Sequence, residues 1–100
     1  MTNFSVAVNS DGRGEAFFID DNGTVMHTWQ ITAQNNQVWQ SPVTLFGDGG
    51  QALTDAVSLG AGADVHGKIQ VVAVTSDGNY HLCYQTQDGP WQGWVDITQQ

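Results

Sequence analysis

The chain has 100 residues, enough for one ordinary domain or for two very small units. Hydrophobic residues make up 40% of it, 12 residues are glycine and only 12% are charged, which suits a turn-rich all-β protein and argues against disorder. Ten acidic residues against two basic ones give a formal net charge of −8, so we expect neither nucleic acid nor a membrane as a partner.

The sequence shows no sign of membrane insertion or secretion. No stretch approaches the roughly 20 apolar residues of a membrane-spanning helix, and the N-terminus lacks the basic start and apolar core of a signal peptide. The single cysteine, Cys83, has no disulfide partner within the chain, and its neighbours Leu82 and Tyr84 predict a buried thiol in a strand. We therefore expect synthesis in the cytoplasm, with any release by a non-classical route.

The first part of the chain predicts four short strands separated by turn residues. The dipeptide Asn22-Gly23 is typical of a tight hairpin turn, and the apolar run AFFI precedes it. A strand exposed on one face would alternate, so a run of this kind predicts a sheet that is covered on both faces. The expected strands span residues 4–9, 14–20, 24–31 and 38–45.

The second part predicts four more strands, with Asp77-Gly78 as the corresponding hairpin turn. The stretch GGQALTDAVS is the one segment that is ambiguous between helix and connector, and its glycines favour a connector over residues 47–54. No other stretch reads as a helix. The expected strands span residues 55–60, 68–75, 79–86 and 91–98.

The two parts are copies of one repeat. With Gly12 set on Gly67, GRGEAFFIDDNGTVMHTWQI lies over GKIQVVAVTSDGNYHLCYQT without a gap. Further on, VWQSPVTL lies over PWQGWVDI, so that the second copy is shorter in its last loop. Upstream we place SVAV over AVSL, which makes the first turn of the second copy longer. An ungapped alternative that places GAGADV over SVAVNS stays open.

This repeat predicts an all-β protein of two four-stranded antiparallel propeller blades, over residues 1–46 and 55–100. Two blades leave an apolar face uncovered at each end, so we expect chains to join head-to-tail into a closed β-propeller. Rings of four, six or eight blades are the candidates. Four blades crowd the axis and eight open it widely, so a six-bladed trimer is favoured and a tetramer comes second.

The repeats resemble the blades of the PLL-like β-propeller lectins, whose pattern is A-V-x-x-D-G-R-L-E-V-F-x-x-x-x-D-G-x-L-W-H-x-W-Q, closed by W-x-x-W. The second unit keeps the closing motif Trp91–Trp94, whereas the first has Pro42 in place of the second tryptophan. Members of this family carry all their blades in one chain, and this chain carries two. The first unit keeps Asp11, Gly12, Arg13, Glu15, Phe17, Gly23, His27, Trp29, Gln30 and Trp39. The second also keeps Gly67, Val71, Asp77, Gly78 and Gln85.

The resemblance implies binding of glycans, commonly fucose-type or O-methylated sugars, in pockets between adjacent blades. Aromatic side chains are the first candidates, because a sugar C–H face stacks on a ring and an indole N–H can donate to a hydroxyl. Trp91 and Trp94 stand at the edge of the last strand beside the DGP turn, where ligand contact and packing are equally expected. Core packing is favoured for the mid-strand Trp29 and Tyr84, and Trp39 falls between the two cases.

Arg13 and Glu15 are the charged candidates. They are two residues apart in a predicted strand, so their side chains point to the same side. A guanidinium and a carboxylate on one face can bracket sugar hydroxyls by paired hydrogen bonds, but a structural ion pair between blades is favoured. The second unit has Lys68 and Gln70 at these positions, so a pocket of this kind would occur once per chain.

The sequence predicts neither a metal nor a cofactor, and no enzyme. The spacings of His27, His66 and His81 match no ligand motif, and turn chemistry explains the run from Asp20 to Gly23. Glycoside hydrolysis usually needs two carboxylates across one bond, and the chain has one glutamate. The predicted function is a carbohydrate-binding lectin that is multivalent through ring assembly. The alternative is a non-catalytic scaffold for protein–protein interaction or a self-assembling structural fragment.

Overall fold

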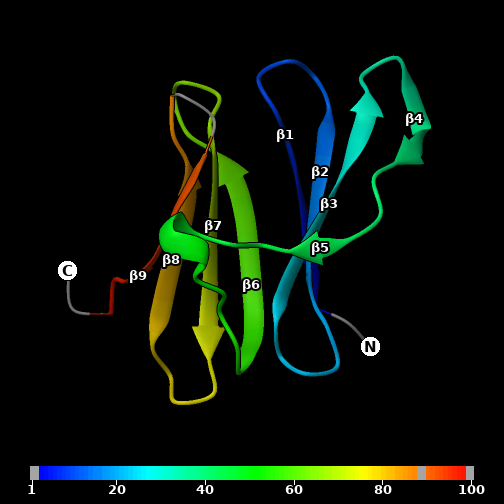
Figure 1. Ribbon diagram of the computed structural model, residues 1–100. Coiled ribbons are helices and arrows are strands. Elements are labelled where there is room, and N and C mark those ends of the chain that lie inside the picture. The colour runs from blue at the N-terminus through cyan, green and yellow to red at the C-terminus, as the bar shows by residue number, and fades with distance from the viewer. Residues whose placement is uncertain (1–2, 88–89, 99–100) are drawn as a thin grey trace.

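The computed structural model describes residues 3–87 and 90–98, which form two antiparallel sheets (Figure 1). This confirms the predicted all-β class with two sheets of about four strands. Among the described residues, no helix is long and apolar enough to cross a membrane. The first sheet consists of β1 (Phe4–Val8), β2 (Gly14–Ile19), β3 (Val25–Thr32) and β4 (Asn35–Trp39) in this order, with β5 (Val43–Thr44) also paired to β3. The second consists of β6 (Ala56–Ala63), β7 (Ile69–Thr75), β8 (Tyr80–Gln85) and β9 (Trp91–Asp96).

The hairpin between the second and third strands is built in the same way in both sheets. Gly23 and Gly78 have φ of 80° and 89°, a backbone conformation that glycine adopts without steric cost. In each turn an aspartate side chain accepts backbone N–H groups, and in the second turn this is Asp77, which accepts the N–H of Asn79. Asp20 Oδ1 accepts the N–H groups of Asn22 and Thr24 at 2.9 and 3.0 Å. Local turn chemistry therefore accounts for the acidic DDNG stretch.

The strand register decides how the two repeats align. Val8 lies opposite Gly14 across β1 and β2, and Ala63 lies opposite Ile69 across β6 and β7. Both equivalent pairs are 55 residues apart, as Gly12 and Gly67 are, so the first turn has the same length in both sheets. The placement of SVAV over AVSL is therefore wrong, and the ungapped alternative is right. As a consequence, β6 extends beyond the predicted end at residue 60.

The last strand differs between the sheets. β9 is continuous, but the strand predicted over residues 38–45 is divided into β4 and β5. Pro42 lies in the gap between them, at the position that Trp94 has in β9. Proline has no N–H to donate to a strand ladder, so it interrupts the strand at this point.

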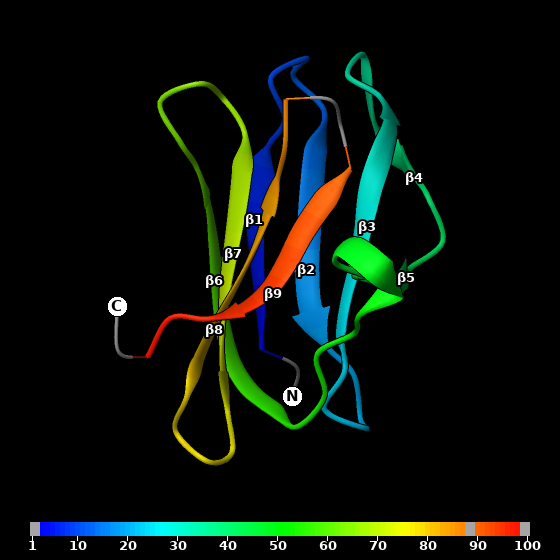
Figure 2. The same cartoon turned by 60° about the vertical axis from the view of Figure 1, so that its left-hand side comes forward.

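The two sheets pack face to face, with β1 beside β6, and the core lies between them (Figures 1 and 2). Two side-chain contacts join these strands: Leu59 N–H donates to Asn3 Oδ1 at 3.0 Å, and Ala61 N–H donates to Ser5 Oγ at 3.1 Å. The single chain thus covers one face of each sheet and leaves the other uncovered, as expected for two blades. The core consists of Ala7, Phe17, Ile19, Val25, Leu45, Leu53, Ala56, Ile69, Val71, Ala73, Cys83 and Trp94.

The connector between the sheets folds back over β9 and contains one short 3₁₀ turn, η1 (Asp48–Gly50). Asp48 Oδ1 accepts the N–H of Gly93 at 3.0 Å. Gly47 lies against the same backbone, because a Cβ built there would overlap the carbonyl of Gly93. The connector therefore holds β9 in place and closes one side of the core.

Candidate functional site

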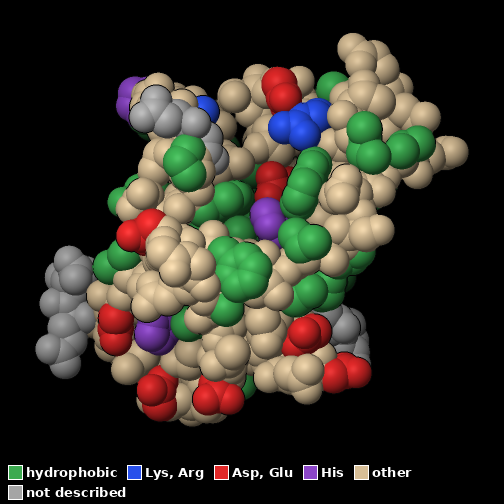
Figure 3. Space-filling view, in the orientation of Figure 1, with side chains coloured by type: hydrophobic (Ala, Val, Ile, Leu, Met, Phe, Trp, Pro, Cys, Tyr) green, Lys and Arg blue, Asp and Glu red, His purple; other side chains and the backbone are tan. Residues whose placement is uncertain are grey.

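Aromatic side chains of both sheets meet at one edge of the interface, in what we call the aromatic groove: Phe17, His27 and Trp29 of the first sheet and Trp91 of the second. The Trp91 ring stands nearly perpendicular to Phe17 and His27, with centroids 5.8 and 5.9 Å apart. The rings of His27 and Trp29 lie 4.9 Å apart. Figure 3 shows a hollow between the sheets, where a histidine and a carboxylate lie among hydrophobic side chains.

A hydrogen-bonded network forms the floor of the aromatic groove. Glu15 and His27 are only 5% and 8% exposed, and Glu15 Oε2 lies 2.7 Å from His27 Nδ1. Asn9 donates to Glu15 Oε1 at 3.0 Å and accepts from Gln85 Nε2 at 2.8 Å. Gln85 belongs to the second sheet, so the network joins the sheets. A buried carboxylate without partners would be costly, and these bonds hold Glu15 in one position.

A polar cavity of about 210 Å³ opens next to this network, among the loops at the upper end of the molecule in Figure 1. Gln85 lines the cavity and lies directly opposite Trp91 in the β8–β9 ladder, so the cavity adjoins the aromatic groove. Both basic residues of the chain, Arg13 and Lys68, also line it. The cavity is lined by Asn9, Ser10, Asp11, Arg13, Lys68, Gln85 and Thr86.

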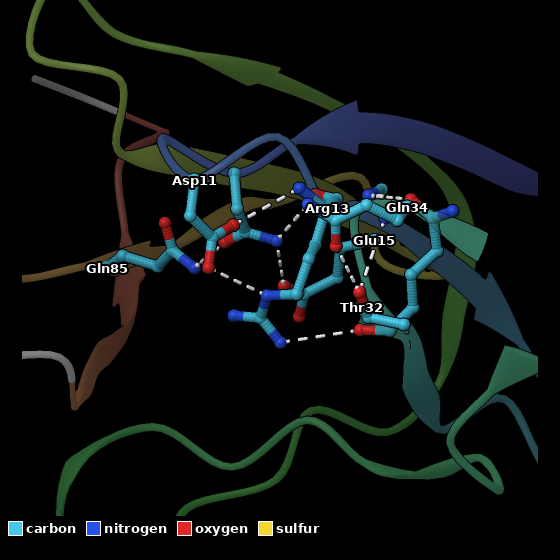
Figure 4. Close-up of polar contacts among 9 residues, drawn as sticks. Asp11, Arg13, Glu15, Thr32, Gln34 and Gln85 are labelled. Atoms are coloured by element: carbon cyan, nitrogen blue, oxygen red, sulfur yellow. Dashed lines mark hydrogen bonds and ion pairs between the residues drawn. The ribbon is translucent and has the colours of Figure 1, made fainter. Parts of the chain in front are cut away.

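Arg13 is held at the rim of the polar cavity (Figure 4). Its Nε donates to Asp11 Oδ2 at 2.8 Å, and its Nη1 donates to the carbonyl oxygen of Gln30 at 3.4 Å. The backbone N–H of Arg13 and then its guanidinium hold the pKa of Asp11 below its usual value. The remaining guanidinium nitrogen, Nη2, has no hydrogen-bond partner among the described residues. This nitrogen is free to donate to a ligand.

The four tryptophans are placed differently. Trp29 and Trp91 flank the aromatic groove, and neither indole N–H bonds to any residue in the described part of the chain. Trp94 is 9% exposed in the core, where its N–H donates to the Leu45 carbonyl at 3.3 Å. Trp39 is 37% exposed on β4 and donates to the carbonyl of Asn36. The DGP turn next to Trp91 includes residues 88–89, which lie outside the described residues.

The two charged candidates do not pair with each other, and Tyr84 lies elsewhere. Arg13 pairs with Asp11 and Glu15 with His27, so the expected partnership of Arg13 with Glu15 does not form. Tyr84 is 36% exposed on the far face of the second sheet, away from the aromatic groove. Within the described part of the chain, no group of three or more histidine, cysteine, aspartate or glutamate side chains is placed to hold a metal ion.

Sequence reasoning missed the roles of Asn9, Gln85 and His27. One signal was present, because glutamine recurs at equivalent positions of the two repeats. Gln30 Oε1 accepts the N–H of Gly14, and Gln85 Oε1 accepts the N–H of Ile69 at 2.8 Å. The bond from Gln85 to Asn9 had no such signal, since it joins residues that are far apart in sequence.

No family model matches the chain, and no curated protein sequence is similar to it. Among solved structures, the BP39L lectin from Burkholderia pseudomallei is similar in fold, with a TM-score of 0.71 and 20% sequence identity. The superposition covers 95% of this chain and 26% of that one, so this chain spans about a quarter of the length of that lectin. The two sheets thus share the fold of about a quarter of that chain.

Proposed function

We propose that this chain binds carbohydrate, without changing it chemically, in the aromatic groove and the adjoining polar cavity. Trp29 and Trp91 carry this proposal, because both flank one groove and both keep an indole N–H without a partner among the described residues. A sugar presents an apolar C–H face that can stack on Trp91 and hydroxyls that can accept from these N–H groups. The fold shared with the BP39L lectin supports this function.

The polar cavity offers the complementary hydrogen-bond partners. Arg13 can donate through its free Nη2, and the carboxamides of Asn9 and Gln85 supply donors and acceptors next to Trp91. Asn9 and Gln85 are already fixed by the network around Glu15, and Arg13 is held by Asp11, so little conformational entropy is lost when a sugar binds. The arrangement suits a small ligand with several hydroxyl groups and one apolar side.

The class of sugar follows from the resemblance to PLL-like lectins, which implies fucose-type or O-methylated sugars. Such sugars carry a methyl group in place of a hydroxyl or on one. A methyl group is favourably buried against aromatic side chains, and the aromatic groove presents the partly exposed rings of Trp29 and Trp91. Assembly of several chains into a ring would place several such sites on one molecule. A six-bladed trimer is favoured and a tetramer comes second, and the combined sites would strengthen weak single contacts through avidity.

A glycan array with matched variants tests this function. Trp91→Ala removes the stacking surface and should abolish binding, whereas Trp91→Phe should keep part of it. Phe46→Ala is the control, because Phe46 is a 52% exposed ring outside both the aromatic groove and the polar cavity. Binding by wild type and Phe46→Ala but not by Trp91→Ala supports the proposal, and a chelator should change none of these results. Equal binding by all variants, or no glycan bound by the wild type, would overturn it.

A further inference from the structure

Each sheet leaves one apolar face without a cover. On the first sheet, Phe4, Val6 and Val8 of β1 are 64%, 54% and 56% exposed. We call this the outer face of the first sheet. On the second sheet, Tyr80 and Tyr84 are 50% and 36% exposed, beside half-buried Val72 and Leu82. This is the outer face of the second sheet. Soluble proteins rarely leave two contiguous apolar faces of this kind in water.

The two outer faces are repeat equivalents of the faces that already pack together inside the chain. Phe17, Val25, His27 and Trp29 face the second sheet or line the interface groove. The residues 55 positions later are Val72, Tyr80, Leu82 and Tyr84, which form the outer face of the second sheet. In the same way, the inward-facing Ile69, Val71 and Cys83 correspond to Gly14, Ala16 and Thr28 of the first sheet's outer face.

We infer that a second copy of this chain packs the outer face of its first sheet on the outer face of the second sheet, repeating the contact within the chain. The contact is head-to-tail, because the two faces differ. The copies at the two ends of such a row would each keep one free outer face, to which further copies bind until the ring closes. The inference specifies how the ring in the proposed function is joined, but the contact itself does not depend on sugar binding.

The sizes of the side chains at this junction are complementary. Inside the chain, Ser5 and Ala7 of β1 face β6, which presents Leu59 and Ala61. At the junction the equivalents would be Gly60 and Gly62, facing Phe4 and Val6 of the second copy. A Cβ built at Gly60 or Gly62 has no atom within 4 Å. The glycines therefore leave room for the larger side chains that β1 of the second copy presents.

The junction would also contain one hydrogen bond between the copies. Inside the chain, Gln85 Nε2 donates to Asn9, and the equivalents of these residues are Gln30 and Asp64. Gln30 is 6% exposed, and its Nε2 makes no hydrogen bond with the residues that the structure describes. Asp64 uses Oδ1 for the N–H groups of His66 and Lys68. Its Oδ2 is therefore placed to accept from Gln30 of the second copy, in a bond strengthened by the carboxylate charge.

The junction would build a second groove from both copies. Tyr84 replaces Trp29 there, Leu82 replaces His27, Gln70 replaces Glu15, and Trp39 of the second copy replaces Trp91. This groove lacks the buried hydrogen bond between Glu15 and His27 and is incomplete without the second copy. If the proposed function holds, the assembled protein binds two sugars per chain by calorimetry. Trp39→Ala should reduce this number to one and leave the site at Trp91 intact, whereas an unchanged number would overturn the second groove.

Light scattering tests the junction itself. The wild type should have a mass that is a multiple of the 10.8 kDa chain. Val6→Asp and Tyr80→Asp each place a charge on one outer face and should give single chains that stay folded by circular dichroism, because both residues are exposed in the isolated chain. Gln51→Glu is the control, since Gln51 is exposed in the connector between the sheets, outside both outer faces. It should assemble as the wild type does.

Mixing the two variants distinguishes a head-to-tail contact from a symmetric one. Val6→Asp keeps an intact second-sheet face and Tyr80→Asp an intact first-sheet face, so an equimolar mixture should form dimers that cannot close. A monomeric wild type, disruption by Gln51→Glu, or no dimer in the mixture would overturn the inference. The single-chain variants keep the aromatic groove at Trp91. Loss of glycan binding together with the expected masses would therefore count against the proposed function and leave the junction standing.

Discussion

Trp91 and Trp94 are three residues apart in one strand, but their surroundings differ. Trp91 lies opposite Gln85 at the groove, while Trp94 falls where the register between β8 and β9 shifts by one residue. Such a bulge re-aims a side chain, and here it turns Trp94 into the core below the connector. The W-x-x-W motif thus serves two purposes, with one tryptophan available to a ligand and the other packing two elements together.

Cys83 is a second residue whose behaviour follows from burial. Its side chain is fully buried in the core, and burial raises the pKa of the thiol to about 12. The reactive thiolate is therefore nearly absent at neutral pH. We expect a maleimide or disulfide reagent to label the native protein very slowly at pH 8 and the unfolded chain rapidly.

The pH dependence of Cys83 has a definite sign. Because the thiol ionises more easily in the unfolded chain, raising the pH above about 9 favours unfolding, and the effect grows until the folded thiol ionises near 12. Labelling kinetics with and without denaturant measure how strongly folding protects the Cys83 thiol. Rapid labelling of native protein at pH 8 would contradict the burial of this side chain.

At the scale of elements, the hairpin turns are the most regular feature of the chain. Asp64 and Asp77 each accept backbone N–H groups within their own turn, and Asp77 also accepts from the Thr75 hydroxyl. For Asp64 the N–H of Lys68 is the main cause of a lowered pKa, and for Asp77 it is the hydroxyl of Thr75. Turns of this kind form from local contacts alone, which is why the sequence predicts them well.

The connector is less regular and depends on close contact with β9. Gly47→Ala places a methyl group into the Gly93 carbonyl, and the N–H of Gly93 bonds to Asp48 of the same connector, so moving the two segments apart strains this bond. We expect this variant to lose about 1–3 kcal/mol of stability or more, by analogy with overpacked cores. Thermal unfolding measures the loss.

Gly60→Ala is the matched control for this experiment. A Cβ at Gly60 meets nothing within 4 Å, and the equivalent position of the first repeat already carries a side chain, Ser5. It should change the melting temperature of the single chain little. Equal melting temperatures for Gly47→Ala and wild type would show that the connector does not hold β9.

At the scale of the whole molecule, assembly should matter more for binding to surfaces than for binding to free sugar. Tyr80→Asp leaves the aromatic groove unchanged, because Tyr80 lies on the opposite face of the second sheet. We expect its affinity for a free monosaccharide to equal that of the wild type. On a densely glycosylated surface it should bind about 10²–10⁴-fold more weakly, since the ring engages several sugars at once.

Calorimetry with free sugar and surface plasmon resonance on the dense surface measure the two affinities. Gln51→Glu serves again as the control, because its charge lies in the connector, outside both outer faces. Equal surface binding by Tyr80→Asp and wild type would show that the sites act singly.

The sequence by itself determined the repeat, the hairpins and the all-β class. These features depend on neighbours in sequence: turn residues at Asn22-Gly23 and Asp77-Gly78, and apolar runs between them. It left the alignment of the first strands open, because AVSL and GAGADV are both acceptable copies of a short apolar strand. Only the pairing of Ala63 with Ile69 removed this ambiguity.

The tertiary structure alone decided which aromatic side chains face a groove and which pack in the core. Trp91 and Trp94 have similar neighbours in sequence, and only the bulge in β9 and the fold of the connector separate them. The network from Glu15 through Asn9 to Gln85 likewise joins residues of different sheets. Contacts of this kind form when one sheet packs on another, so no local pattern of residues predicts which side chains will touch.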